Sequence, residues 1–326
     1  MRYIVGVDIG GTNVVVGTVQ EDGHSLHGFQ TEPTDRSGGP GATVDQVNRL
    51  VAASLSQARA ELGSAIDVVG VGIGSPGPLD TRSGTVLLTP NLGWTEMPLR
   101  DRVAAAAGLP ATLDNDANCA VLGEWWRGAA QGGKVVVGLT IGTGIGGGIV
   151  LDGKIYHGAN DYAGEIGHAS IDQAGRRCNC GNYGCLEAYA SGPAVARRAV
   201  EGLEAGAESR LAEYVDGNMA AITARTVSQA ASDGDVFCLE VIRETAHYLG
   251  GAIANLVNIF NPDTVVVCGG VTLAGRHLFD PLCNQVRRRA FRPAVAACRI
   301  VAGSLPGTAG VIGAIASFRE QTWGLD

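Results

Sequence analysis

The chain lacks the features that mark membrane, secreted or nucleic-acid-binding proteins. No apolar run approaches the roughly 18 residues of a membrane span, and the N-terminus has no charged region followed by an apolar signal segment. No run of Lys or Arg is longer than the three arginines at 287–289 and the formal net charge is −8, which argues against nucleic acid or an anionic membrane as partner. We therefore expect a cytoplasmic protein that acts on small molecules.

Charged residues are scarce and glycine is abundant. Charged residues make up 17% of the chain and hydrophobic residues 45%, so the chain can bury sizeable cores. Its 326 residues exceed what one core usually supports, which predicts two domains, although no Pro- or Ser-rich linker marks a boundary. The 49 glycines cluster at the ends of apolar runs. This placement predicts many strand-to-turn junctions where backbone approaches a ligand.

One imidazole and three thiols are spaced H-x9-C-x-C-x4-C in the middle of the chain. His168, Cys178, Cys180 and Cys185 are a complete tetrahedral ligand set for Zn²⁺, and two glycines lie between the last two thiols. The alternatives are a disulfide or buried free cysteines. A disulfide between Cys178 and Cys180 would strain a very short loop, and neither alternative explains the histidine and the glycines. We therefore predict a structural zinc site, and five ordinary reduced cysteines elsewhere.

The N-terminal segment predicts a β-hairpin with an unusual tip. The runs 3–8 and 14–19 are strand-like and flank a Gly-Gly-Thr-Asn turn. The N–H groups and hydroxyl of such a tip can wrap a phosphate, and Asp8 can hold Mg²⁺ directly or through water. An ordinary turn is the alternative, because short glycine motifs match often by chance. The predicted phosphate ligands at this tip are Gly10, Gly11, Thr12 and Asn13.

The same design recurs in the second half of the chain. The strand-like run 135–140 leads into a second glycine-rich loop and another apolar run, so we predict two related domains with a nucleotide between them. The residues predicted for the phosphates in this loop are Gly142, Thr143, Gly144, Gly146 and Gly147. A third glycine pair, Gly269 and Gly270, ends the strand-like run from residue 265. It could lie against a base or ribose, or form a plain strand-to-helix turn.

Polar residues suited to a polyol gather at one helix start. Asp116 lies between Asn115 and Asn118, where a carboxylate could merely cap the helix. The crowding of acids and amides better fits a sugar, and a carboxylate beside an incoming hydroxyl can orient it and accept its proton. Asn91 and Trp94 also suit a sugar, with an ordinary loop that carries a half-buried Trp as the alternative.

Five motifs together resemble the ROK family of sugar kinases, and within it the bacterial glucokinases. They are D-I-G-G-T-N from Asp8, D-N-D-A-N from Asp114, L-T-I-G-T-G-I-G-G-G from Leu139, E-I-G-H from Glu165, and C-N-C-G-N-Y-G-C-L-E from Cys178. The resemblance covers nearly the whole chain. ROK repressors are similar too, but they carry a helix-turn-helix segment before the first glycine loop, and Asp8 here lies close to the N-terminus.

The resemblance implies a fold and a division of roles. The fold is a duplicated actin-like (ribonuclease H-like) pair of α/β domains around a nucleotide and sugar cleft. We expect one domain over 1–118 with the C-terminal helix at about 303–326, and a second domain with the zinc loop over 119–302. Asp116 is then the catalytic base. The sugar ligands are Asn115, Glu165, His168 and Glu187, with Gly77 and Asn91; Gly269 and Gly270 lie near the adenosine.

The implied reaction is transfer of the ATP γ-phosphoryl group to the 6-hydroxyl of D-glucose, with Mg²⁺ as cofactor. The alternatives are a kinase for another hexose or N-acetylhexosamine, such as mannose, fructose, N-acetylglucosamine or N-acetylmannosamine, and a non-catalytic sugar sensor. Many relatives carry Lys where this chain has Asn13, a loss of charge that suits weaker ATP binding or another donor such as polyphosphate. A homodimer or homotetramer is expected from the family.

Overall fold

The chain forms two compact units in the computed structural model, which describes residues 1–324. The first comprises Met1–Lys134, Gly148–Gly164 and Ser304–Asp326, and the second Val135–Gly147 and Glu165–Gly303. The sequence placed the change of domain after residue 118. In the structure it follows Lys134, because helix α3 (Asp116–Arg127) packs along the C-terminal helix α10 (Ala309–Trp323) of the first unit.

The first unit contains a five-stranded sheet in the order β3-β2-β1-β4-β8. The first three strands pair antiparallel, and β4 and β8 extend the sheet in parallel with β1. The strands are β1 (Arg2–Ile9), β2 (Asn13–Gln20), β3 (Leu26–Pro33), β4 (Asp67–Ser75) and β8 (Ala111–Asn115). The predicted N-terminal hairpin is confirmed, since Ile9 pairs with Val14 across its tip.

A second five-stranded sheet repeats the same order, β11-β10-β9-β12-β13. Its strands are β9 (Val135–Ile141), β10 (Ile145–Leu151), β11 (Lys154–Ile155), β12 (Thr264–Gly269) and β13 (Arg299–Ala302), and the division between the units falls within β10. Across each sheet the first three strands of the repeat lie in reverse order of sequence. Two further strands, which run parallel to the first strand of the repeat, complete the sheet. The duplication expected from the two glycine loops is therefore confirmed in the strand order.

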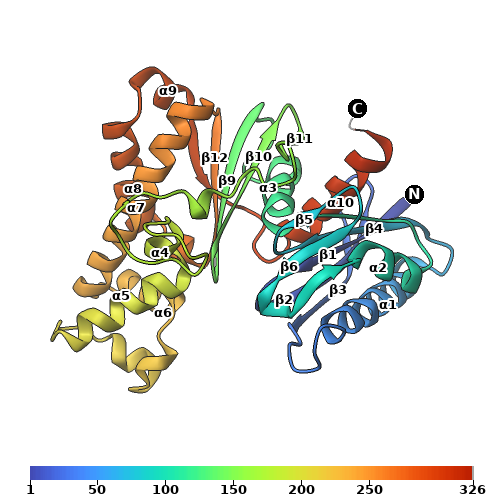
Figure 1. Cartoon of the computed structure of the whole chain (residues 1–326), viewed down its shortest axis with the longest axis horizontal. Coiled ribbons are helices and arrows are strands. Elements are labelled where there is room, and N and C mark those ends of the chain that lie inside the picture. Colours follow the sequence, from blue (N-terminus) through green and yellow to red (C-terminus); the bar gives the residue numbers. More distant parts are fainter. Residues whose placement is uncertain (325–326) are drawn as a thin grey trace. The chain divides into compact units, whose positions relative to one another are not determined.

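Helices cover the two faces of the first sheet (Figure 1). Side chains alternate along β1: Val5, Val7 and Ile9 join the core formed with α1 (Ala42–Leu62), whereas Gly6 lies against Val311 of α10. Asp8, two residues on, contacts the start of α10 as well. The alternation of β1 therefore places the acid of the first glycine motif on the α10 face.

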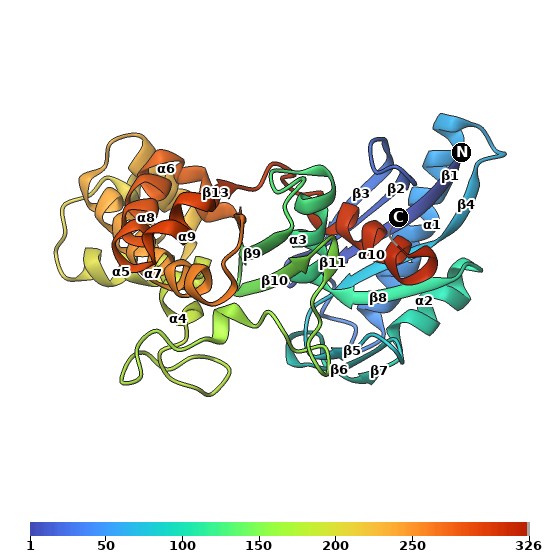
Figure 2. The ribbon, with the colours of Figure 1, turned by 90° about the horizontal axis from the view of Figure 1, so that it is seen from above.

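The remaining elements complete the two units. The first also holds α2 (Leu99–Ala107), a small sheet of β5 (Leu79–Asp80), β6 (Thr85–Thr89) and β7 (Trp94–Met97), and the 3-10 turn η1 (Pro90–Leu92). The second holds α4 (Glu187–Ala190), α5 (Gly192–Glu204), α6 (Ala224–Ser232), α7 (Val236–Phe260), α8 (Arg276–Arg289), α9 (Arg292–Ala297) and the 3-10 turns η2 (Ile166–His168), η3 (Leu211–Val215), η4 (Met219–Ala221) and η5 (Gly270–Ala274). Figure 2 shows helices α5 to α9 gathered together. Among the described residues, no helix is both long and apolar enough to cross a bilayer.

Candidate active site

Two carboxylates of the first unit lie close enough to influence each other. Asp8 is near the end of β1, and Asp116 is the first residue of α3. Burial raises the pKa of Asp8 to about 7, and the charge of Asp116 adds to the rise. A bound cation beside these acids would reverse this effect, because its charge favours the ionised carboxylate.

The turn that carries Asp116 is held by its neighbours. Asn115 is the N-cap of α3, and its side-chain oxygen accepts hydrogen bonds from the backbone N–H groups of Ala117 at 2.9 Å and Asn118 at 3.1 Å. The Asp116 carboxylate also accepts from the N–H of Ala117, at 2.9 Å. Asn115 therefore caps two N–H groups of the helix and Asp116 shares one of them, so the cap does not depend on Asp116 alone.

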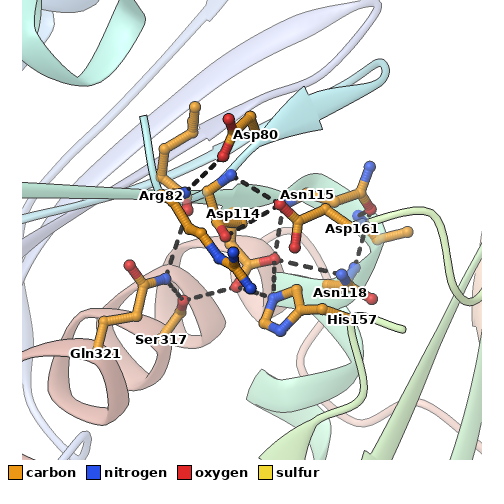
Figure 3. Close-up of polar contacts among 12 residues, drawn as sticks. Asp80, Arg82, Asp114, Asn115, Asn118, His157, Asp161, Ser317 and Gln321 are labelled. Atoms are coloured by element: carbon orange, nitrogen blue, oxygen red, sulfur yellow. Dashed lines mark hydrogen bonds and ion pairs between the residues drawn. The ribbon is translucent and has the colours of Figure 1, made fainter. Parts of the chain in front are cut away.

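A third carboxylate, Asp114, is buried directly beneath this turn (Figure 3). It accepts hydrogen bonds from Asn115 N at 2.8 Å, Ser317 Oγ at 2.9 Å and Asn118 Nδ2 at 3.3 Å. Its oxygens also lie 3.0 and 3.2 Å from Nε2 of His157. The sequence analysis assigned no role to Asp114, His157 or Ser317, because their contacts join residues 43 and 203 positions apart.

The first glycine loop is fastened to the chain that follows β3. Thr34 donates its backbone N–H to the carbonyl of Thr12 at 2.9 Å and its hydroxyl to the carbonyl of Gly10 at 2.8 Å. A further hydrogen bond closes the tip, from Gly10 N to the carbonyl of Asn13 at 2.8 Å. With its carbonyls engaged in this way, the loop has a fixed shape before any ligand binds.

The second glycine loop is fastened to the segment that begins α4 and α5. Its three-residue turn 142–144 is closed by Gly142 N donating to the carbonyl of Gly144 at 2.9 Å. Gly192 N donates to the carbonyl of Gly142 at 2.9 Å, and Glu187 Oε2 accepts from Ile145 N at 2.9 Å. Glu187, expected only as a sugar ligand, therefore also supports the loop. The third glycine pair, Gly269 and Gly270, is exposed where β12 passes into η5.

The predicted metal ligands come together in the second unit. One ligand atom from each of His168, Cys178, Cys180 and Cys185 lies within 4.8 Å of all the others. Cys178 Sγ is 3.8 Å from His168 Nδ1, and Cys180 Sγ is 3.6 Å from Cys185 Sγ. A tetrahedral Zn²⁺ with bonds of about 2.3 Å to sulfur sets S···S distances of about 3.8 Å. The four residues thus fit zinc, and all three cysteines are free thiols.

The loop around this cluster needs its glycines. Gly181 and Gly184 have φ values of 93° and 73°, a region that residues with a Cβ rarely adopt. Burial raises the pKa of the Cys185 thiol to about 12, with further rises from its hydrogen bonds to Cys180 and Cys178. Burial also raises the pKa of Cys178, whereas hydrogen bonds from its neighbours outweigh burial and lower the pKa of Cys180. A divalent cation supplies the charge that makes three thiolates favourable together. The Cys178 thiol also donates to Glu187 Oε1 at 3.7 Å, which joins the cluster to the second glycine loop.

The two loops proposed for sugar contacts differ in the structure. Asn91 is exposed within η1, as a ligand residue could be. Trp94 is only 1% exposed, and its indole N–H donates to the carbonyl of Pro40 at 2.7 Å, so the suggestion that it presents an apolar face to a sugar was wrong. Gly77 has a φ of 95°, and a Cβ there would lie 2.6 Å from the carbonyl oxygen of Leu88. This close approach gives Gly77 a structural role in addition to the proposed one.

The predicted site residues are divided between the units. Gly77, Asn91, Asn115 and Asp116 belong to the first, with the loop that follows Asp8. Glu165, His168 and Glu187 belong to the second, with both later glycine motifs.

Metal analysis tests the cysteine cluster directly. We expect about one equivalent of zinc per chain, and Cys180→Ser should lose both metal and folded stability, because structural zinc binding contributes folding free energy. Cys283→Ser, which changes a half-buried thiol outside the cluster, should keep the metal. A metal-free protein with unchanged stability would contradict the zinc assignment.

The raised pKa of Asp8 predicts how stability depends on pH. Its folded value of about 7 lies above its ordinary value of 3.8, so the folded state binds more protons between these values. In Mg²⁺-free buffer the Asp8 contribution should therefore be fully present below about pH 4 and be lost as pH rises through 7. Asp8→Asn should flatten this part of the profile. Urea unfolding midpoints at pH 4.5, 6 and 8 measure the pH dependence of stability. The same change of midpoint with pH in the unaltered protein and in Asp8→Asn would disprove the prediction.

Comparison with known proteins places this geometry in a family. The chain matches the ROK family over residues 4–321. It is 39% identical to the glucokinase of Halalkalibacterium halodurans, covering 96% of this chain and 93% of that one, and 37% identical to the glucokinase of Thermotoga maritima, covering 98% of both. The crystal structure of a ROK family glucokinase from Streptomyces griseus in complex with glucose and AMPPNP superposes with a TM-score of 0.84 at 35% identity, over 98% of this chain and 99% of that one. The chain is a member of the ROK family and has its actin-like ATPase fold.

Proposed function

We propose that the protein is an ATP-dependent glucokinase that converts D-glucose to glucose 6-phosphate. The observation that carries the proposal is Asp116, presented at the start of α3 beside Asp8, on a helix that Asn115 caps. The likeness to glucokinases over nearly the whole chain supports glucose as the sugar.

In this proposal Asp116 is the general base. Its carboxylate accepts the proton of the sugar 6-hydroxyl while that oxygen bonds to the γ-phosphorus, and the bond to the bridging oxygen breaks to release ADP. Asn115, through its amide N–H groups, and Glu165, Glu187 and Asn91 bind the sugar hydroxyls. Positioning and charge stabilisation provide most of the catalysis, because the transition state of phosphoryl transfer is loose.

The metal cluster supports the sugar site through His168. Nδ1 faces the cysteines, 3.8 Å from Cys178 Sγ, so Nδ1 would bind zinc and Nε2 would carry the proton. That N–H is then a hydrogen-bond donor to the sugar. Zinc itself supplies structure here, because four protein ligands complete its coordination.

The glycine loops bind the nucleotide in this proposal. The loops 10–13 and 142–147 hold the phosphates, Gly269 and Gly270 lie near the adenosine, and Asp8 holds Mg²⁺. Magnesium would neutralise charge that develops on the phosphates. A cytoplasmic homodimer or homotetramer belongs to the same proposal.

A coupled assay for ADP release, with ATP, Mg²⁺ and a panel of hexoses and N-acetylhexosamines, tests the function. The proposal requires the highest kcat/KM with glucose. A higher kcat/KM with an N-acetylhexosamine or another hexose would support a sugar kinase with that sugar, in place of glucose, as its substrate. Absence of turnover with every sugar, and with polyphosphate as donor, would favour a sugar sensor.

Asp116→Asn tests the mechanism. We expect kcat to fall by about 10² to 10⁴, the usual contribution of a general base, while glucose still binds because the amide keeps the shape of the side chain. Single-turnover kinetics and glucose titration calorimetry measure the two effects. Asp101→Asn, an exposed acid on α2, is the control and should change neither. Near-normal turnover in Asp116→Asn would remove Asp116 from this role.

A further inference from the structure

Asp114 joins several parts of the first unit that are distant in the sequence (Figure 3). It is the penultimate residue of β8. Its carboxylate is bound by Asn115 N, by Asn118 of α3, by Ser317 of α10 and by His157 from the segment after β11. The Asp114 side chain is 2% exposed and that of His157 is 26% exposed. Among these donors, only His157 can carry a positive charge.

The surroundings of His157 favour that charge. Burial opposes the imidazolium, but the hydrogen bond to Asp114 and the negative charges of Asp114, Asp161 and Glu320 raise the pKa of His157 above its usual value. These acids face the ring from β8, from its own segment and from α10 respectively. These contacts therefore favour a cationic partner for the buried carboxylate, without which its burial would be costly.

Asp114 is also coupled to the turn that carries Asp116. The same oxygen that accepts from Asn115 N lies 3.2 Å from His157, and Asn115 caps the helix that Asp116 begins. Burial raises the pKa of the Cys119 thiol, and the charges of Asp114, Asp8 and Asp116 all add to that rise. Asp114, Asp8 and Asp116 thus lie around the same thiol. Movement of Asp114, or loss of the positive charge beside it, would disturb Asp8 and Asp116.

We propose that His157 is a positioning residue for phosphoryl transfer. Its imidazolium holds Asp114, and Asp114 in turn holds the Asn115–Asp116 turn in its working orientation. This inference rests on the proposed role of Asp116 as general base.

Two variants of His157 separate charge from shape. His157→Gln keeps a hydrogen-bond donor of modest size but loses the charge, whereas His157→Arg keeps the charge in a larger side chain. We expect kcat to fall by about tenfold to 10²-fold in His157→Gln, the scale of a small misplacement of a catalytic group, with KM for ATP unchanged. His157→Arg should retain most of kcat. Ser317→Ala, which removes a neutral hydrogen bond from the same carboxylate, is the matched control and should change kcat by less than about threefold.

The outcomes are distinguishable. A purely structural role predicts the reverse order, with the larger Arg more harmful than Gln and thermal stability falling together with activity. That result, or a kcat for His157→Gln within about twofold of the unaltered protein, overturns the inference alone. If the unaltered protein phosphorylates no sugar, the proposed function and this inference both fail.

The first glycine loop carries the uncharged Asn13, and an arginine lies beside it. The segment after β3 packs on this loop through Thr34, and two residues later the Arg36 guanidinium lies 3.8 Å from the position that a Cβ on Gly11 would occupy. Among the described residues, Arg36 has no hydrogen bond or ion pair, while Asp35 beside it is engaged by Ser37. An exposed arginine thus lies beside the loop that is predicted to bind phosphate.

We infer that Arg36 binds the phosphate groups of the nucleotide at the first glycine loop. A guanidinium forms charge-assisted hydrogen bonds to phosphate, so it supplies the cation that Asn13 lacks. The inference rests on the proposed binding of ATP phosphates at residues 10–13.

Nucleotide titrations with and without phosphates test this assignment. Arg36→Ala should raise KM for ATP and Kd for AMPPNP by about tenfold or more, the cost of a lost charged hydrogen bond, and leave glucose and adenosine binding unchanged. Adding Asn13→Lys should recover much of the loss. Arg59→Ala, an equal change of charge at the end of α1, is the control. Unchanged ATP and AMPPNP constants in Arg36→Ala overturn the inference, whereas failure of the unaltered protein to bind ATP refutes the proposed function itself.

Discussion

The burial of the Asp114 carboxylate constrains much of the first unit. Removing one partner from a buried ion pair costs about 3–5 kcal/mol in general, and somewhat less where one partner is partly exposed, as His157 is. Such a charge can be kept only if several elements supply donors to it at once. The end of β8, the start of α3, the middle of α10 and the segment after β11 are therefore held at one point, next to the turn that carries Asp116.

The sequence predicted well those parts of the fold that depend on short stretches of chain. The N-terminal hairpin and the gathering of His168 with Cys178, Cys180 and Cys185 follow from turn residues and ligand spacing within short stretches. The repeated strand order confirms the duplication first indicated by two glycine loops. The hairpin and the cluster each lie within a short stretch of chain, where spacing alone limits the possible structures.

Contacts between distant segments were not predictable in this way. His157 and Asp114 carry no motif that pairs them, and Glu187 gave no sign that it would bind the N–H of Ile145. Trp94 was assigned to the sugar site from its residue type, because an indole suits a sugar. In the structure its side chain is buried in the core of the first unit. The boundary after Lys134 was missed because the α3 and α10 packing joins the middle of the chain to its end.

The repeated sheet also differs between its two copies at the edges. The outer strands of the second sheet, β11 and β13, have two and four residues, whereas β3 at the edge of the first has eight. Short outer strands expose few unpaired backbone groups to another chain. The eight-residue edge ends in Glu32 and Pro33, residues that discourage continued pairing. The second sheet thus limits edge-to-edge pairing by the shortness of its outer strands, and the first by the residues that end β3.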